Sequence, residues 1–175
     1  MTWTDQIGNL LKQYTSGGAA AAPAPDVHAH FDQVAEAAPS STLAEGLSAA
    51  FKSDQTPAFG QMLSTLFNNS SGEQKAGIIN QIMGSVPSGT LTSLLSGAGL
   101  AGILGSGAKQ ITPEQAQKIS PEAVQQLATQ AHADNPSIVD SVSTFYAQHS
   151  TLIKTLGGTA LTIALAKVAE KQRQA

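Results

Sequence analysis

The stretch that decides the fold is residues 76–108, AGIINQIMGSVPSGTLTSLLSGAGLAGILGSGA. Its 33 residues include eight glycines and fifteen apolar residues, but no Asp, Glu, Lys, Arg or His. The isoleucines up to Met83 recur at helical spacing, which predicts the buried end of an amphipathic helix. Glycine is too frequent after Gly84 for a long helix. We therefore predict an apolar, Gly-rich connector over residues 87–110, too short and too broken to cross a bilayer.

On either side of this stretch, the sequence carries repeated signals for helix starts. Thr112-Pro-Glu and Ser120-Pro-Glu each offer a hydroxyl cap, Pro at the first helical position and Glu in the first turn. Other predicted starts are Asp26, Thr42 with Glu45 as a capping box, Thr56 with Pro57, either Ser70 with Glu73 or Ser71 with Gln74, Asn135 with Pro136, and Ser150, which begins the last helix. No stretch alternates apolar and polar residues. The fold class is therefore all-α, with seven to nine short amphipathic helices in an irregular bundle.

Composition along the chain predicts five segments. Residues 1–15 form an amphipathic helix, and the Gly/Ala/Pro-rich linker 16–25 makes it a flexible N-terminal arm. Residues 26–86 and 111–175 form two helical halves that flank the connector, and residues 26–172 are expected to form one domain.

The totals exclude several classes of protein. The absence of Cys excludes disulfides, thiolate metal sites and a Cys nucleophile. The net charge is −3, and the only basic cluster, Lys167, Lys171 and Arg173, lies where cations complement a helix C-terminus. We therefore predict no nucleic-acid partner. With no signal peptide and no apolar run long enough to span a membrane, the expected location is cytoplasmic, with envelope association as the alternative.

Three groups of residues invite a chemical interpretation. Residues 97–102 match the dinucleotide-binding pattern G-x-G-x-x-G, but they lack the strand that this pattern requires before it. His28, His30 and Asp32 suggest a metal site, yet positions two apart on a helix face in nearly opposite directions. We therefore assign these side chains to a solvated helix face.

His132, Asp134 and His149 lie around one junction between helices, and they would be the first residues to test for catalysis. Both histidines are expected at the ends of helices, where a cationic imidazole is favourable, so capping accounts for them. We predict no catalytic residue, no cofactor and no metal ligand.

We predict a non-catalytic helical interaction or structural protein that binds a protein partner, because several apolar side chains lie on candidate docking faces. The alternative is a peripheral membrane or envelope-associated protein, with a membrane surface as the weaker partner. The candidate interaction surface consists of Trp3, Leu10, Leu11, Leu91, Leu94, Leu95, Leu100, Ile103 and Leu104.

Three phrases resemble one known family: FDQVAEAAP, LAEGLSAAFKSDQTPAFGQMLSTLF and NPSIVDSVSTFYAQHSTLIKTLGG. The family consists of uncharacterised, hypothetical proteobacterial proteins that are small, helical and rich in Ala, Gly and Gln. The resemblance covers about residues 26–170. It implies a bacterial source and an all-helical fold, and it brings no catalytic residues.

Overall fold

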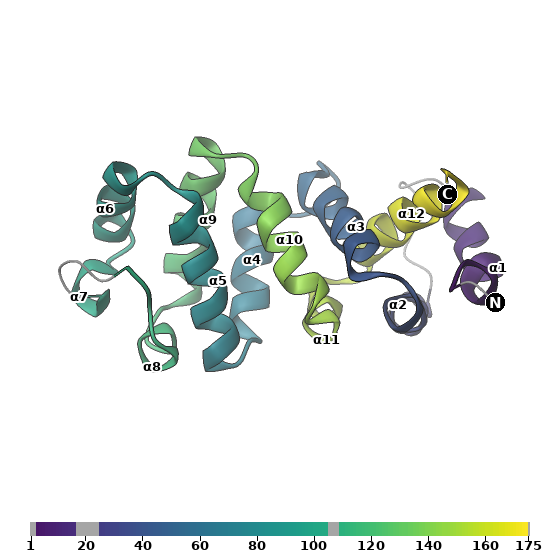
Figure 1. The fold of residues 1–175 in the computed structure, drawn as a ribbon, viewed down its shortest axis with the longest axis horizontal. Helices are drawn as coiled ribbons and strands as arrows, with labels where there is room; N and C mark the ends of the chain where they lie inside the picture. Colours follow the sequence, from purple (N-terminus) through teal and green to yellow (C-terminus); the bar gives the residue numbers. More distant parts are fainter. Residues whose placement is uncertain (1–2, 17–24, 105–108, 175) are drawn as a thin grey trace. The chain divides into compact units, whose positions relative to one another are not determined.

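The computed structural model describes residues 3–16, 25–104 and 109–174. Across these residues the chain forms twelve α-helices and one short 3-10 helix, without any strand (Figure 1). The predicted all-α class is therefore confirmed. The predicted seven to nine helices is an undercount, because the connector itself contains helices and the last predicted helix is divided.

The helices group into two compact units. Unit 1 combines Met1–Pro57 with Ser143–Ala175, and unit 2 is the continuous segment Ala58–Val142. This division differs from the predicted halves 26–86 and 111–175. Proximity along the chain suggested those halves, whereas helices from opposite ends of the chain pack together in unit 1.

Unit 1 is organised around its last helix, α12 (Gly158–Gln174), on which three helices from the start of the chain pack. These are α1 (Trp3–Ser16), α2 (Val27–Ala37) and α3 (Ser40–Lys52). The remaining elements are the C-terminal part of α10 (Ile138–Ala147), α11 (Ser150–Ile153) and the 3-10 helix η1 (Lys154–Leu156).

The first helix is part of the core of unit 1. Ile7, Leu11 and Tyr14 are buried, and α1 packs on both α2 and α12. The prediction of a flexible arm is therefore wrong for this helix, because its apolar face is covered by its own unit. The predicted linker lies mostly outside the described residues.

Unit 2 is organised around α9 (Pro121–Asp134) in the same way, with α4 (Phe59–Asn68), α5 (Gly72–Ser85) and α6 (Ser88–Gly97) packed on it. Two short helices, α7 (Ala101–Leu104) and α8 (Pro113–Ala116), follow α6. The N-terminal part of α10 completes the unit.

The prediction of a connector over residues 87–110 is wrong for the part up to Leu104, since α6 and α7 lie there, and residues 105–108 lie outside the described residues. A glycine turn separates these two helices. The Leu100 N–H donates to the Leu95 carbonyl at 2.7 Å, and the Gly99 N–H donates to the Ser96 carbonyl at 3.2 Å. Gly99 has a φ of 71°, which a glycine adopts without strain. This pattern is the Schellman motif, so Gly99 ends a helix that forms.

The predicted caps divide into two groups. Those of α5, α8 and α9 are confirmed: Ser71 and Thr112 form capping boxes with Gln74 and Gln115, and Ser120 accepts from the Ala123 N–H. Each of these contacts joins residues three positions apart. Local sequence was therefore sufficient to predict them.

The predicted caps at Thr42 and Thr56 are wrong. Helix α3 begins at Ser40, so Thr42 lies inside the helix and is buried. Helix α4 begins at Phe59, and the Thr56 hydroxyl instead donates to the Ala50 carbonyl at 2.6 Å. The last carbonyls of a helix lack a partner within that helix, so a carbonyl at the end of α3 can accept a hydrogen bond from the Thr56 hydroxyl.

The last predicted helix does start at Ser150, but it does not continue. Gly157 has a φ of 85°, and it separates η1 from α12. The preceding turn is therefore a short helix of its own, α11.

The two units have the same internal topology. In each unit one long helix packs on three others, and a short helix precedes it in the chain and packs on the second of the three. The matching elements are α1 with α4, α2 with α5, α3 with α6, α11 with α8, and α12 with α9. Unit 2 is inserted in unit 1 along the chain, between α3 and α11.

The sequence carries the same duplication. Residues 39–50 read PSSTLAEGLSAA and residues 87–98 read PSGTLTSLLSGA, which share seven of twelve positions. Pro39 (φ −56°, ψ 143°) and Pro87 (φ −57°, ψ 143°) start α3 and α6 with the same backbone geometry. The equivalent positions in this part of the two units are therefore 48 residues apart.

The second half of each unit repeats with an offset of 37 residues. Thr112 and His149 occupy the N-cap positions before the four-residue helices α8 and α11. Four pairs of equivalent residues on α9 and α12 are buried: Val124 and Leu161, Leu127 and Ala164, Ala128 and Leu165, Ala131 and Val168. The chain thus contains one helical unit twice, which the sequence analysis did not detect.

Candidate functional site

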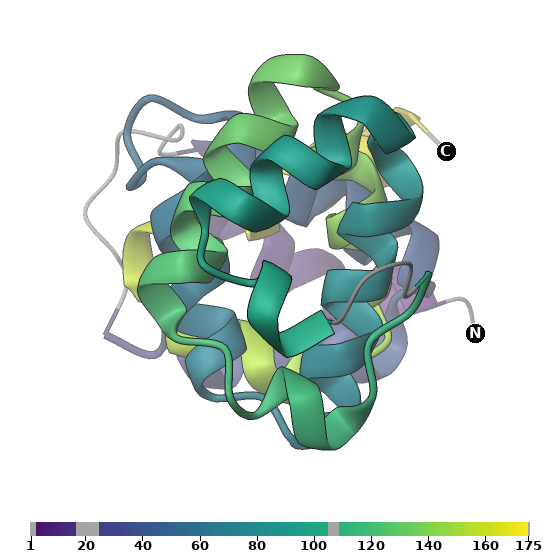
Figure 2. The same ribbon diagram turned by 90° about the vertical axis from the view of Figure 1, so that its left-hand side faces the viewer.

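A groove runs between α6 and α9 in unit 2, with a volume of about 360 Å³. Helices α6 and α7 face the viewer in Figure 2. The groove is lined by Thr90, Ser93, Leu94, Gly97, Ala98, Gln126, Leu127, Gln130 and Asp134. Its volume is within the range of small-ligand sites. We call it the α6–α9 groove.

The polar side chains of the α6–α9 groove are available for a ligand. Thr90 and Ser93 supply hydroxyls, Gln126 and Gln130 supply amides, and Asp134 supplies a carboxylate. Within the described part of the chain, none of these five side chains has a hydrogen bond or ion pair. They contrast with Asn80 and Asn135 in the same unit, which donate to backbone carbonyls.

Among the described residues that line the groove, Asp134 is the only ionisable one. It is the last residue of α9, where the backbone carbonyls already carry partial negative charge. A carboxylate at this end of a helix is unfavourable, and a nearby cation would offset that cost. The α6–α9 groove therefore favours a positively charged group.

At the equivalent place in unit 1, the third helix approaches the long helix closely. Gly46 lies so close to α12 that a Cβ there would be 2.7 Å from the Ala164 carbonyl oxygen. Unit 2 has Leu94 at the equivalent position, and this side chain lines the α6–α9 groove. In unit 1 a hollow of about 310 Å³ is lined by Ala49, Ile163 and Lys167, the equivalents of Gly97, Gln126 and Gln130, but not by Gly46.

A second exchange changes the charges across the same pair of helices. In unit 1 the Lys171 Nζ lies 3.0 Å from a Glu45 carboxylate oxygen. The equivalent residues in unit 2 are Asp134 and Ser93. Unit 2 therefore has a carboxylate on the long helix, and neither of these two positions supplies a cation.

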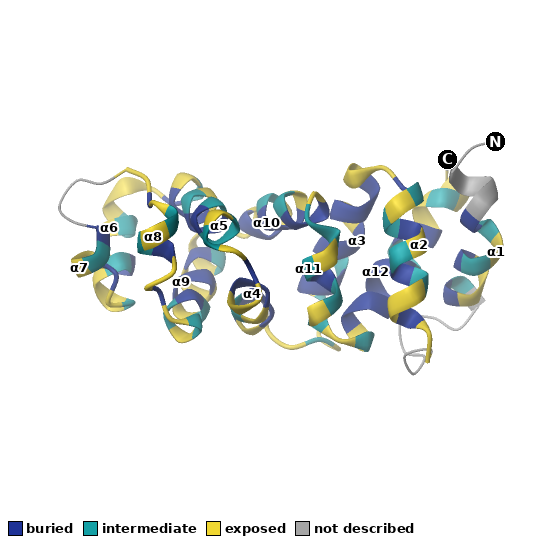
Figure 3. Cartoon of the chain, turned by 90° about the horizontal axis from the view of Figure 1, so that it is seen from below, coloured by how far each residue is buried: buried dark blue, intermediate teal, exposed yellow. Residues whose placement is uncertain are grey.

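Helix α6 also exposes leucines that α3 buries. Leu43 and Leu47 are 3% and 1% exposed, whereas the equivalent Leu91 and Leu95 are partly exposed. Figure 3 shows the same contrast: much of α3 is buried, and most of α6 is exposed or intermediate. We call Leu91 and Leu95, together with the partly exposed Ile103, the α6–α7 apolar face.

The structure divides the predicted interaction surface. The buried members are Leu11, Leu94, Leu100 and Leu104, and among them Leu94 lines the α6–α9 groove. Those that keep partial exposure are Leu10, Leu91, Leu95 and Ile103. The Trp3 side chain lies outside the described residues.

The three residues considered for catalysis have separate surroundings. The His132 ring packs on Phe59 of α4, with 5.5 Å between ring centroids, while Asp134 lines the α6–α9 groove. His149 belongs to unit 1, where its ring lies 5.0 Å from that of Phe145. Both histidines thus pack on a phenylalanine ring.

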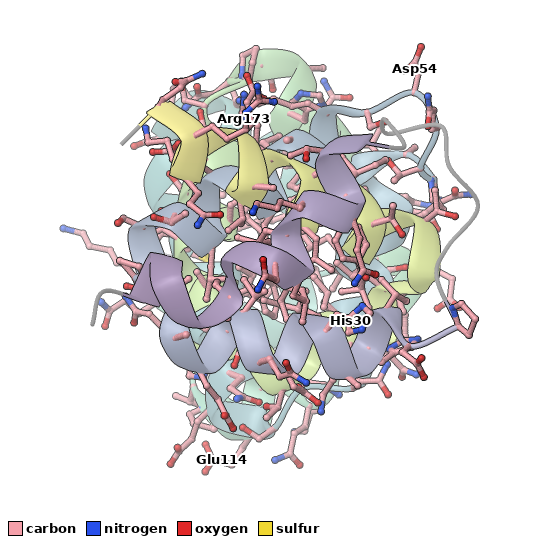
Figure 4. The ribbon with its side chains drawn as sticks, turned by 90° about the vertical axis from the view of Figure 1, so that its right-hand side faces the viewer. His30, Asp54, Glu114 and Arg173 are labelled. Atoms are coloured by element: carbon pink, nitrogen blue, oxygen red, sulfur yellow. The ribbon has the colours of Figure 1, made fainter. Side chains whose placement is uncertain are left out.

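The histidines of α2 also have structural surroundings. The His30 Nδ1 lies 2.7 Å from the Tyr14 hydroxyl, and this contact joins α2 to α1 (Figure 4). Burial, followed by the nearby Asp26 carboxylate, raises the pKa of the Tyr14 hydroxyl above its ordinary value of 10.0. Asp32 pairs with Lys154 at 3.0 Å, and His28 is exposed.

No group of three or more His, Asp or Glu side chains lies together among the described residues in a way that could hold a metal ion. Nor does the described part of the chain contain a helix of the length and apolarity that crossing a membrane would require.

Unit 1 has two smaller hollows where α1 meets α12, of about 310 Å³ and 170 Å³, and the larger one is also lined by Ala49 of α3. Arg173, which Figure 4 labels, lines both. The larger one contains the ion pair of Lys167 with Glu170, at 3.0 Å. Opposite charges therefore already meet there, in contrast to the α6–α9 groove.

Comparison of the chain with models of protein families, with curated proteins and with solved structures found no match.

Proposed function

We propose that the chain is a non-catalytic interaction module that binds a protein partner through unit 2. The α6–α7 apolar face and the adjoining α6–α9 groove form the binding surface. The observation that carries this proposal is the contrast within the chain itself: α6 leaves partly exposed the leucines that α3 buries.

The surroundings of this surface also support binding rather than chemistry. Residues 76–108 contain no charged side chain, so a partner that covers the α6–α7 apolar face desolvates no charge from this segment. Gly89, Gly97 and Gly102 have no atom within 4 Å of a built Cβ, so packing in the described residues does not require glycine there. Helix backbone without Cβ atoms permits close approach of another chain.

The proposal is tested by photo-cross-linking in cells of the source organism. A photoreactive residue at Leu95 should give one discrete adduct with a second protein. The same residue at Gln61, an exposed position on α4, serves as the matched control and should give none. The double variant L91S/L95S, carrying the photoreactive residue at Ile103, should lose the adduct while keeping its circular dichroism spectrum, because both leucines are only partly buried.

The alternative of peripheral membrane association uses the same apolar face. Vesicle flotation of the full chain distinguishes the two proposals. Flotation that L91S/L95S abolishes would favour the membrane. Adducts of equal yield at Leu95 and Gln61 would contradict the proposed protein-binding surface.

A further inference from the structure

We propose that the α6–α9 groove binds the side chain of a lysine from the partner, with its ammonium group at Asp134. This inference rests on the proposed function, because it names the chemistry that the partner must present. Three features support it: the charge of the groove, the side chains that line it, and the equivalent site in unit 1.

The charge of the groove favours a cation. Asp134 is the only ionisable residue among its described lining residues, and it lies at the carbonyl end of α9. A bound ammonium group would therefore offset both the carboxylate charge and the helix dipole. Hydrogen bonds between such charged groups are stronger than those between neutral groups.

The walls of the groove match the two parts of a lysine side chain. Leu94 and Leu127 supply apolar surface for the aliphatic stem, which amphipathic side chains bury while the charge stays near water. Ser93 and Gln130 supply two further oxygen acceptors. Together with the Asp134 carboxylate, they match the three N–H donors of an ammonium group.

Unit 1 shows that this pair of helices can bring such groups together. Between α3 and α12, the ammonium group of Lys171 lies 3.0 Å from the Glu45 carboxylate. In unit 2 the carboxylate is on the long helix, at Asp134, and the equivalent of Glu45 is the smaller Ser93. A lysine from a partner would restore in unit 2 the ion pair that unit 1 makes within its own chain.

The test is a titration of the full, ¹⁵N-labelled chain, followed by two-dimensional NMR. The probe is Nα-acetyl-lysine N-methylamide, and the matched probe without charge is its Nε-acetylated form. The variants are D134N, which removes the carboxylate charge, and E122Q, which removes a charge from the exposed first turn of the same helix.

We expect saturable shifts of the amide signals of Ser93, Leu94, Gln130 and Asp134. D134N should weaken binding of the lysine probe about three- to fivefold, since an ion pair exposed to water contributes up to about 1 kcal/mol. E122Q should leave it unchanged, and the acetylated probe should cause no saturable shift. Added salt should weaken binding, because Asp134 is exposed.

Three results would overturn the inference: equal binding by wild type and D134N, equal shifts with the acetylated probe, or shifts spread over exposed carboxylates of both units. Tighter binding of 1,5-diaminopentane than of the lysine probe would assign the groove to a free diamine instead of a lysine side chain. A negative titration beside a clear adduct at Leu95 would overturn this inference and leave the proposed function standing. Saturable binding of the lysine probe without any adduct at Leu95 would overturn only the proposed function.

Discussion

Units 1 and 2 share one helical plan, and they differ most where their third helix meets their long helix. In unit 1, Gly46 allows α3 to approach the backbone of α12, and Glu45 pairs with Lys171. In unit 2, Leu94 and Ser93 stand at the equivalent positions, and the α6–α9 groove remains open. The comparison indicates that exchanges at these positions distinguish a closely packed helix pair from a candidate binding site in a duplicated unit.

The same comparison separates packing from binding among the leucines. Leu43 and Leu47 contribute to the core, whereas the equivalent Leu91 and Leu95 remain partly exposed. A repeated sequence therefore does not imply a repeated role. The information about function lies in the residues that differ between the two copies. It also lies in the different burial of residues that are identical in both.

The largest expected effect comes from giving unit 1 the leucine of unit 2. G46L should lower the free energy of unfolding by about 3 kcal/mol, because the nearest obstacle is the Ala164 backbone, which cannot move aside as a flexible side chain could. Urea denaturation followed by circular dichroism measures this. The control G89A, at a glycine with no neighbour within 4 Å of a built Cβ, should change stability by less than about 1 kcal/mol. An unchanged urea midpoint for G46L would contradict the close contact.

The next largest difference is expected between variants of two equivalent residues, Asn80 in α5 and Asp32 in α2. Asn80 exchanges two hydrogen bonds with the Ile111 backbone, at 2.7 and 3.2 Å, whereas Asp32 makes an ion pair that is well exposed to water. N80A should cost about 2 kcal/mol, because it leaves backbone groups unsatisfied. D32A should cost less than about 1 kcal/mol. The order would be wrong if urea denaturation found D32A to be the more damaging variant.

A smaller effect is expected from the helix caps. S120A removes the acceptor of the Ala123 N–H at the start of α9 and should cost about 1 kcal/mol. S88A changes an exposed residue in the first turn of α6, where no side-chain cap bond is present, and should change stability by less than about 0.5 kcal/mol. Thermal unfolding of the two variants side by side measures the difference. Equal melting temperatures would argue against the cap.

The smallest expected effect is a dependence on pH that originates in unit 1. The pKa of Tyr14 is higher in the folded chain than its ordinary value of 10.0, so the folded chain holds this proton more tightly. The stability from this group is complete below about pH 10 and decreases as the pH rises through the folded pKa. Urea midpoints of wild type should therefore fall more steeply than those of Y14F above about pH 10. Parallel curves would contradict the shifted pKa.

Part of this structure could be predicted from the sequence, because part of it is determined locally. The caps of α5, α8 and α9 depend on residues three positions apart, and short-range spacing also predicted the all-α class. The fates of Thr56 and Leu11 depend on contacts with neighbours that local patterns do not specify. The groove was missed because Gly46 and Leu94 become informative only when residues 48 positions apart are aligned.

Two groups of candidate residues show the same limit of prediction from local sequence. Asp134 was considered beside His132 as a catalytic group, but the two side chains have different surroundings. Leu91 and Leu95, singled out by their spacing in an uncharged segment, are partly exposed, whereas Leu100 and Leu104 of the same predicted surface are buried. Burial separates these pairs, and it depends on which helix covers which face.

The most direct test of the account is a cross-link across each helix pair, made possible by a chain without cysteine. A short reagent with two maleimide groups should join E45C to K171C, and it should join S93C to D134C with similar yield. T92C with D134C is the control, because Thr92 does not line the α6–α9 groove, and its yield should be lower. Efficient linkage in unit 1 without linkage between positions 93 and 134 would contradict the equivalence of the two units.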